Sequence, residues 1–310
     1  MTNEVKALIL CNNPIAVPGI REFLFYGKAG AIVVTKRNKE MQGLIRSLTE
    51  GTGVPLIVVT KDDLQEKLVD AITKYEINTG VVMTFPFILP EKIWNLPARG
   101  FINFHYGLLP QCRGPQPVLR HLLNNDAEAG ITLHKVDGGI DTGEIIIQEK
   151  IKIADTDTYG SLQSKLAYLA AKPAANLLKI LSYGSVLPSK PQDETKAHYY
   201  EMPGKDELTI NWSDMSGEKI TRLVNACNPW NKGAGTTIND WFIGITEVEL
   251  LGETKGKPVG TVLTADEIEG LTVQTCDNRV LKINIVYTQE GFYSGHKLAG
   301  FGIKKGMQFV

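Results

Sequence analysis

The stretch FINFHYGLLPQCRG, residues 101–114, decides the fold of this 310-residue chain. Its first five residues alternate, so Ile102 and Phe104 point to one face of a strand while Asn103 and His105 point to the other. The strand then continues into a loop rich in glycine and proline. An amide and an imidazole that leave a strand side by side can polarise a carbonyl group, because asparagine donates through its NH2 group and histidine titrates near neutrality. We therefore expect a site at this strand end, where α/β proteins place theirs.

A second segment, GITLHKVDGGIDTG at residues 130–143, reads as an apolar strand that leads into a glycine-rich turn. The turn contains Asp137 and Asp141. An aspartate there can return to His105, orient its imidazole and raise its pKa, because a neighbouring carboxylate favours the protonated ring. We therefore expect the two segments to form one site.

Short apolar runs alternate with helical patterns along the first part of the chain. We expect strands at residues 5–11, 31–35, 56–59, 80–84 and 101–105, and helices at residues 18–25, 40–50 and 61–74. This alternation predicts an α/β fold with a parallel sheet covered on both faces. A dinucleotide site is disfavoured because Asn12, Asn13 and Pro14 follow the first strand in place of a glycine-rich fingerprint. A helical pattern at residues 156–183, kinked or broken at Pro173, ends this domain.

The pattern changes after residue 183. Residues 184–206 contain three prolines and read as a linker. Beyond it, one helix near residues 217–226 is followed by several short β segments. They lie at residues 241–251, 259–263, 271–275 and 280–286. Short strands without intervening helices are typical of a small barrel. We predict a catalytic domain at residues 1–183, a linker at 184–206 and a small β-rich domain at 207–310.

Composition and charge exclude several classes of protein. The net charge is −1 and the hydrophobic content is 43%, so nothing draws the whole chain to nucleic acid or to an anionic membrane. The four cysteines form no CxxC pair, which disfavours a zinc site and a disulfide framework. No apolar run reaches the roughly 18 residues that a membrane span needs, and no signal peptide is visible. We expect a reduced, cytoplasmic protein without a metal or a membrane partner.

Several motifs resemble, in the same order, those of the 10-formyltetrahydrofolate-dependent formyltransferases. They are NPIAVPGIREF at residues 13–23, the Asn-x-His strand with LLPQCRG, DGGIDTG at residues 137–143, INW at residues 210–212 and NPW at residues 228–230. Within this family the resemblance is closest to methionyl-tRNA formyltransferase and to the lipid A aminoarabinose formyltransferase domain, and it covers nearly the whole chain. It implies a Rossmann-like formyltransferase domain followed by an OB-like C-terminal domain.

The resemblance also implies roles for single residues. Asn103, His105 and Asp141 match catalytic positions, whereas Asp137 matches a structural turn position. The implied formyl donor is 10-formyltetrahydrofolate, so the expected cofactor is a folate. We expect it to lie against eight residues: Met83, Phe85, Phe87, Ile88, Gly107, Leu108, Leu109 and Pro110. Gly107 stands where the family frequently has serine, so one side-chain hydrogen bond is missing there while a backbone contact survives.

Three further residues, Arg113, Cys112 and His134, have more than one possible role. Arg113 either binds a phosphate of the acceptor or ties down the loop through carbonyls. Cys112 suggests a nucleophile, which the resemblance disfavours because the family does not use a thiol. His134 lies within the apolar run ITLHKV and is predicted to be packed or solvated rather than catalytic.

The implied reaction is attack of a primary amine on the formyl carbon. There are two candidate acceptors: a small amine such as an amino-sugar nucleotide, and initiator methionyl-tRNA. The tRNA enzyme has an extended basic loop after its second strand, whereas residues 36–39 here pass almost at once into a helix. From Lys205 onward, 11 lysine and arginine residues stand against 13 acidic residues, a net charge of −2. Binding of a polyanion needs clustered positive charge, so the small amine is favoured. There are two alternative functions. One is folate binding without turnover. The other is hydrolysis of 10-formyltetrahydrofolate, and the enzymes that catalyse it usually carry a separate domain before the catalytic one.

Overall fold

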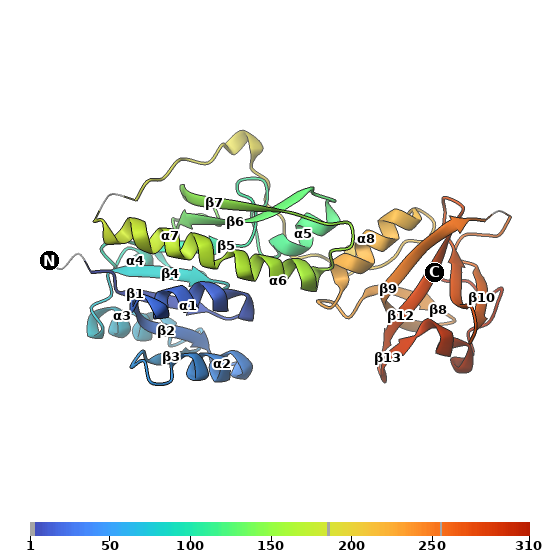
Figure 1. Ribbon diagram of the computed structural model, residues 1–310, viewed down its shortest axis with the longest axis horizontal. Coiled ribbons are helices and arrows are strands. Elements are labelled where there is room, and N and C mark those ends of the chain that lie inside the picture. Colours follow the sequence, from blue (N-terminus) through green and yellow to red (C-terminus); the bar gives the residue numbers. More distant parts are fainter. Residues whose placement is uncertain (1–3, 185–186, 255) are drawn as a thin grey trace. The chain divides into compact units, whose positions relative to one another are not determined.

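The structure, a computed structural model, describes residues 4–184, 187–254 and 256–310. Its N-terminal part contains a seven-stranded sheet with the order β3-β2-β1-β4-β5-β6-β7 (Figure 1). The strands are β1 (Ala7–Cys11), β2 (Ala29–Thr35), β3 (Leu56–Val59), β4 (Thr79–Met83), β5 (Phe101–His105), β6 (Glu128–Lys135) and β7 (Ile145–Lys152). Strands β1 to β5 pair in parallel, and β6 and β7 extend the sheet with antiparallel pairing. The predicted α/β class with a mostly parallel sheet is confirmed.

The central strand β1 is fully buried, as its uninterrupted apolar sequence requires. The turn that follows β1 is built from asparagine side chains rather than from glycines. Asn12 Oδ1 accepts a hydrogen bond of 2.7 Å from the Thr35 hydroxyl, and the Asn12 carbonyl accepts one of 2.7 Å from the amide of Asn38. These bonds hold the end of β1 against the short connection between β2 and the next helix.

Helices cover both faces of this sheet (Figure 1). They include α1 (Val17–Phe25), α2 (Lys39–Thr49), α3 (Leu64–Lys74), α4 (Glu91–Trp94) and α7 (Ala171–Ser182). Along the chain, α5 (Pro117–Leu123) follows β5, and α6 (Tyr159–Leu169) precedes α7. On one face Leu8 and Leu10 of β1 share a core with Leu68 of α3. On the other face the Met83 side chain lies beside Gly19 of α1, and α1 packs against α7.

The helical pattern at residues 156–183 forms two helices, α6 and α7, with Ala170 between them. Pro173 lies in the first turn of α7, where its missing backbone N–H removes no intrahelical hydrogen bond. The helical pattern is therefore broken before Pro173, at Ala170 between the two helices.

The C-terminal part contains a six-stranded antiparallel sheet with the order β10-β11-β12-β9-β8, and β13 pairs with β12. The strands are β8 (Ala234–Ile238), β9 (Trp241–Glu253), β10 (Val262–Asp266), β11 (Gly270–Gln274), β12 (Arg279–Thr288) and β13 (Gly291–Ser294), and the helix α8 (Gly217–Cys227) precedes them. Near the C-terminus, Gln308 pairs with Thr261 beside β10, and Phe309 pairs with Ile238 of β8. The end of the chain thus bridges both edges of the sheet, and the predicted β-rich second domain is confirmed.

The chain divides into two compact units whose segments interleave along the sequence. One comprises Met1–Pro117, Glu128–Lys152 and Gln163–Tyr200, and the other comprises Val118–Ala127, Ile153–Leu162 and Glu201–Val310. The segment predicted as a linker contributes its residues up to Tyr200 to the first unit, and the predicted boundaries at 183 and 206 stay predictions. Every candidate site residue lies in the first unit. In the described part of the chain, no helix combines the length and the apolar character needed to cross a membrane.

Candidate active site

The C-terminal end of β5 carries the polar pair predicted from its alternation. Asn103 is half-buried, and His105 is buried with 6% of its surface exposed. Because β6 runs antiparallel to β5, Asn103 lies directly opposite His134, and His105 lies opposite Thr132. Residues directly opposite each other in an antiparallel pair share one face of the sheet. The two strands therefore place two imidazoles and an amide on the same face.

The turn between β6 and β7 brings Asp141 to this face. Asp137 Oδ1 closes the turn by accepting hydrogen bonds from the N–H of Gly139 at 3.1 Å and from the hydroxyl of Thr142 at 2.6 Å. Asp141 itself has a φ of 56°, a left-handed conformation that is uncommon for residues with a side chain. Asp137 thus shapes the turn, while Asp141 faces the strands.

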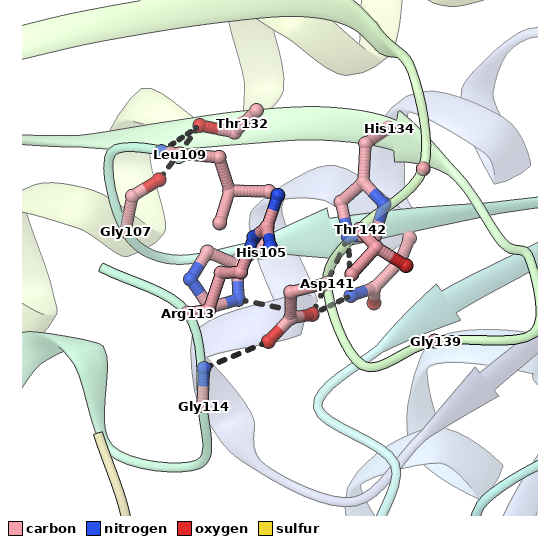
Figure 2. Close-up of polar contacts among 12 residues, drawn as sticks. His105, Gly107, Leu109, Arg113, Gly114, Thr132, His134, Gly139, Asp141 and Thr142 are labelled. Atoms are coloured by element: carbon pink, nitrogen blue, oxygen red, sulfur yellow. Dashed lines mark hydrogen bonds and ion pairs between the residues drawn. The ribbon is translucent and has the colours of Figure 1, made fainter. Parts of the chain in front are cut away.

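The Asp141 carboxylate is the centre of a polar cluster (Figure 2). Its Oδ1 atom lies 3.5 Å from His105 Nδ1, 3.4 Å from His134 Nε2 and 3.3 Å from Asn103 Nδ2. Its Oδ2 atom accepts a hydrogen bond of 2.9 Å from the backbone N–H of Gly114. The structure therefore brings together the three residues predicted to be catalytic and adds His134. Within the described residues, no group of three or more histidine, cysteine or acidic side chains is placed to hold a metal ion.

These contacts keep Asp141 ionised. Burial by itself would raise the pKa of this carboxyl group. The charge of His105, the contact with His134 and the hydrogen bond from Gly114 outweigh burial and hold the pKa of Asp141 well below its usual range. The attraction is mutual, so the carboxylate also stabilises the protonated imidazole of His105.

The ring of His105 faces an oxygen acceptor on each side. Its Nε2 lies 2.6 Å from the carbonyl oxygen of Cys112, which can only accept, so this nitrogen donates. Its Nδ1 faces the Asp141 carboxylate, which also accepts. At 3.5 Å a protonated imidazole would form an ion pair with this carboxylate, so the geometry favours the charged form of His105.

The donors of the cluster are engaged, but some of the contacts are long. The Asn103 amide approaches His134 Nε2 at 3.1 Å and Asp141 Oδ1 at 3.3 Å. Hydrogen bonds weaken as they lengthen beyond about 3 Å, so a substrate oxygen can replace the contacts to Asp141 with least loss. The arrangement can then supply one N–H from Asn103 and one from His105 to a carbonyl oxygen, while Asp141 can accept a proton.

The contact of His134 with the polar cluster was not predicted from the sequence. It is packed as predicted, with 3% of its side chain exposed, and it also contacts Asn103 and Asp141. Its Nδ1 lies 2.8 Å from the carbonyl oxygen of Lys135 and donates to it, which turns Nε2 toward the cluster. The signal that could have revealed this role is the antiparallel register of β6, which places His134 opposite Asn103.

The predicted folate tetrapeptide after β5 is held by one hydroxyl group. Thr132 Oγ1 donates to the Gly107 carbonyl at 2.7 Å and accepts from the Leu109 N–H at 3.2 Å. Gln148 Nε2 donates to Thr132 Oγ1 at 3.0 Å and to the Leu109 carbonyl at 2.9 Å. A Cβ atom at Gly107 would lie 2.7 Å from both His105 Nε2 and Pro117 Cβ, so a serine at this position would require one of these neighbours or the backbone to shift.

The structure does not bring together the four residues predicted to line an apolar slot. Met83 is fully buried beside Gly19 of α1. Phe85 and Phe87 make an edge-to-face pair with ring centroids 5.5 Å apart and pack against the core on the side of α3 and α4. Ile88 is 80% exposed. Met83 belongs to β4 and the others to the bend after it, which separates them; their contact with a folate stays a prediction.

Arg113 and Cys112 hold the loop in this structure. The buried Arg113 guanidinium donates to the side-chain carbonyl oxygen of Gln192 and to the carboxylate of Glu194. Binding of an acceptor phosphate by Arg113 stays a prediction. Cys112 meets His105 through its backbone carbonyl, while its Sγ lies 3.8 Å from the carbonyl oxygen of Pro117. This placement disfavours the thiol as a nucleophile.

Comparison with known proteins matches both parts of this chain to formyl transferases. Residues 26–176 match the family model described as formyl transferase, and residues 204–292 match the formyl transferase C-terminal domain. The chain is 32% identical over 248 residues to a methionyl-tRNA formyltransferase of Marinobacter nauticus, covering 79% of this chain and 77% of the relative.

Among solved structures, HypX from Aquifex aeolicus in complex with tetrahydrofolic acid has a TM-score of 0.68 and 16% sequence identity to this chain. The match covers 96% of this chain and 47% of the HypX chain. An N-formyltransferase from Helicobacter canadensis, in complex with folinic acid and dTDP-3-aminofucose, has a TM-score of 0.67 at 19% identity, covering 93% of this chain and 100% of that one. At these identities the structural likeness concerns the fold.

Proposed function

Because the chain belongs to the formyl transferase family, we propose that it transfers the formyl group of 10-formyltetrahydrofolate to a primary amine. The observation that carries this proposal is the convergence of Asn103, His105 and Asp141 around one carboxylate oxygen. A folate-binding protein without turnover would not require an amide and a protonated imidazole within 3.5 Å of one ionised carboxylate. The half-buried Phe85 and Phe87 and the exposed Ile88 would suit the flat ring of a folate.

In this mechanism the donor, when bound, supplies the formyl carbon. The amine nitrogen would bond to this carbon, the bond between the carbon and the folate nitrogen would break, and tetrahydrofolate would leave with a proton on that nitrogen. Negative charge develops on the formyl oxygen during attack, and Asn103 Nδ2–H and the His105 imidazolium would donate to it. Donors of this kind each contribute roughly 3 to 4 kcal/mol to stabilisation of the transition state. The ionised Asp141 would hold His105 in its protonated form and accept, directly or through water, the proton that the amine loses.

We expect His134→Phe to lower kcat by roughly tenfold to a hundredfold with little change in KM for the folate donor. Phenylalanine fills the buried space but removes the nitrogen that orients Asn103 and Asp141, and small displacements of catalytic groups are costly. Steady-state kinetics and thermal unfolding would be measured for both proteins. His296→Phe is a matched control, because this imidazole lies in the C-terminal sheet domain and contacts the Glu267 carbonyl at 3.1 Å. Full activity in folded His134→Phe would leave His134 with a packing role alone.

We further propose that the acceptor is a small amine, for example an amino-sugar nucleotide. The connection between β2 and α2 is only residues 36–38, and it is held by the hydrogen bond from Asn38 to the Asn12 carbonyl. It is therefore too short to form an extended basic loop like the one expected for the tRNA enzyme. The net charge of −2 from Lys205 onward supports the same acceptor. Initiator methionyl-tRNA remains the second candidate, because the Marinobacter nauticus relative is a methionyl-tRNA formyltransferase.

A folate-release assay across a panel of amines, from amino-sugar nucleotides to charged initiator tRNA, tests both proposals. We expect efficient formylation of a small amine, with an apparent affinity that depends only weakly on salt. Recognition of tRNA would instead give a log–log salt slope of about −0.7 to −0.9 for each contacted phosphate. Efficient, steeply salt-dependent formylation of initiator tRNA would overturn the small acceptor and keep formyl transfer. Folate binding without turnover on any acceptor would overturn both.

A further inference from the structure

A segment predicted as a linker contacts both sides of the catalytic cluster. We name residues 187–200 the strap. Near its start, Lys190 exchanges two backbone hydrogen bonds, of 2.8 and 2.9 Å, with Ile145 at the beginning of β7. Further along, the Arg113 N–H donates to the His198 carbonyl at 2.9 Å, and the Tyr200 N–H donates to the Arg113 carbonyl at 2.9 Å. The strap therefore joins the strand after the Asp141 turn to the loop that carries Gly114.

We infer that Gln192, in the middle of the strap, is a positioning residue for Asp141. Its Nε2 donates to the backbone carbonyls of Asp141 and Gly143, each at 2.8 Å. Its Oε1 accepts from Arg113 Nε at 3.2 Å and from Arg113 Nη2 at 2.9 Å. Both donors and both lone pairs of the side-chain amide are thus used. A single side chain links the Asp141 turn to the residue that precedes Gly114.

The position of Gly114 depends on the same segment. Gly114 donates its N–H to Asp141 Oδ2 at 2.9 Å and has a φ of 111°. A Cβ atom at this position would lie 2.1 Å from the carbonyl oxygen of Tyr200, so the strap packs directly against the glycine backbone. Arg113 is anchored further by two hydrogen bonds to Glu194, of 3.0 and 2.6 Å. The donor to the carboxylate and the carboxylate itself are therefore held by one strap.

Asp141 needs such support because its backbone is left-handed. A residue with a side chain keeps a positive φ only where the surrounding structure holds it there. Gln192 binds the carbonyl of this very residue, so loss of its NH2 group would let the turn relax and move the carboxylate away from His105. This role rests on the proposed formyl transfer, in which Asp141 keeps His105 protonated.

Two substitutions distinguish the role of the Gln192 NH2 group from that of its carbonyl oxygen. Gln192→Leu removes both sets of hydrogen bonds, whereas Gln192→Glu keeps an acceptor for Arg113 but cannot donate to the two carbonyls. We expect each variant to lower kcat by roughly tenfold to a hundredfold with little change in KM for the folate donor. Gln308→Leu is the matched control, because its amide donates to the Val259 carbonyl at 2.7 Å in the C-terminal sheet domain, and it should retain wild-type kcat. Full activity of Gln192→Glu would overturn the proposal, since Gln192 would then serve only to hold Arg113.

A double-mutant cycle with Asp141→Asn tests whether Gln192 acts through Asp141. We expect Gln192→Leu to reduce kcat in the wild-type background and to have almost no further effect beside Asp141→Asn. Equal effects in both backgrounds would contradict the proposal. One measurement does not require a formyl acceptor. It is hydrogen exchange of the Gly114 amide, followed by NMR on the whole chain. Its protection should fall by about tenfold or more in both Gln192 variants, and unchanged protection would overturn the proposal even if no formyl acceptor is found.

Discussion

Replacing His105 or Asn103 by alanine is expected to lower kcat for formyl transfer by roughly 10²- to 10³-fold in each case. The two side chains extend from the same face of β5, and each brings an N–H to the Asp141 carboxylate that a formyl oxygen can take over. Both variants leave Asp141 its hydrogen bond of 2.9 Å from the Gly114 N–H, although His105→Ala also removes the positive charge beside this carboxylate. We therefore expect the fold and the affinity for the folate donor to change little. Steady-state kinetics, folate titration and thermal unfolding measure the three effects.

His296→Ala is the control for these two variants. Its imidazole lies in the C-terminal sheet domain and is expected to have no influence on the reaction. Near-normal turnover in either His105→Ala or Asn103→Ala would remove the proposed stabilisation of the formyl oxygen. An equal loss of folate binding and of turnover would instead assign the residue to binding of the donor.

The fold and the three central residues could be predicted because local patterns carry them. The strands of the first domain are short apolar runs, and the alternation of Phe101–His105 by itself places Asn103 and His105 on one face. The strands β7 (Ile145–Lys152), β8 (Ala234–Ile238) and β13 (Gly291–Ser294) were missed. The strands β8 and β13 are short and contain glycine, and their pairing with β9 and β12 stabilises them more than their own sequences do.

The rest of the site depends on contacts between distant residues, which no local pattern reveals. His134 joins the cluster only because β6 is antiparallel to β5, whereas the preceding strands suggested parallel pairing. The partners of Arg113, Gln192 and Glu194, lie 79 and 81 residues further along the chain, in a proline-containing segment that reads as a linker. Composition alone cannot distinguish a linker from a strap, because both are polar and irregular.

Asp141→Asn is expected to lower kcat by roughly 10²- to 10⁴-fold and to shift the pH–rate profile. Asparagine keeps the size of the side chain but removes the charge that stabilises the His105 imidazolium, so the basic limb of the profile should move to lower pH. Asp137→Asn makes the same chemical change in the same turn, and its Oδ1 can still accept from Gly139 and Thr142. This control should keep both the rate and the profile of the wild type. An unshifted profile at full rate in Asp141→Asn would return Asp141 to the role of a turn residue.

The depressed pKa of Asp141 adds a prediction for stability with a definite sign. A carboxyl group whose pKa is lower in the folded state stabilises the protein above its unfolded-state pKa of about 3.9, and the stabilisation is lost as pH falls below that value. At pH 7 the wild type should therefore be more stable than Asp141→Asn, and the difference should shrink progressively below about pH 4. Chemical denaturation of both proteins at pH 7 and pH 3 measures it. A difference that is the same at both pH values would mean that the Asp141 charge does not stabilise the fold, and that His105, His134 and Gly114 hold this side chain by geometry alone.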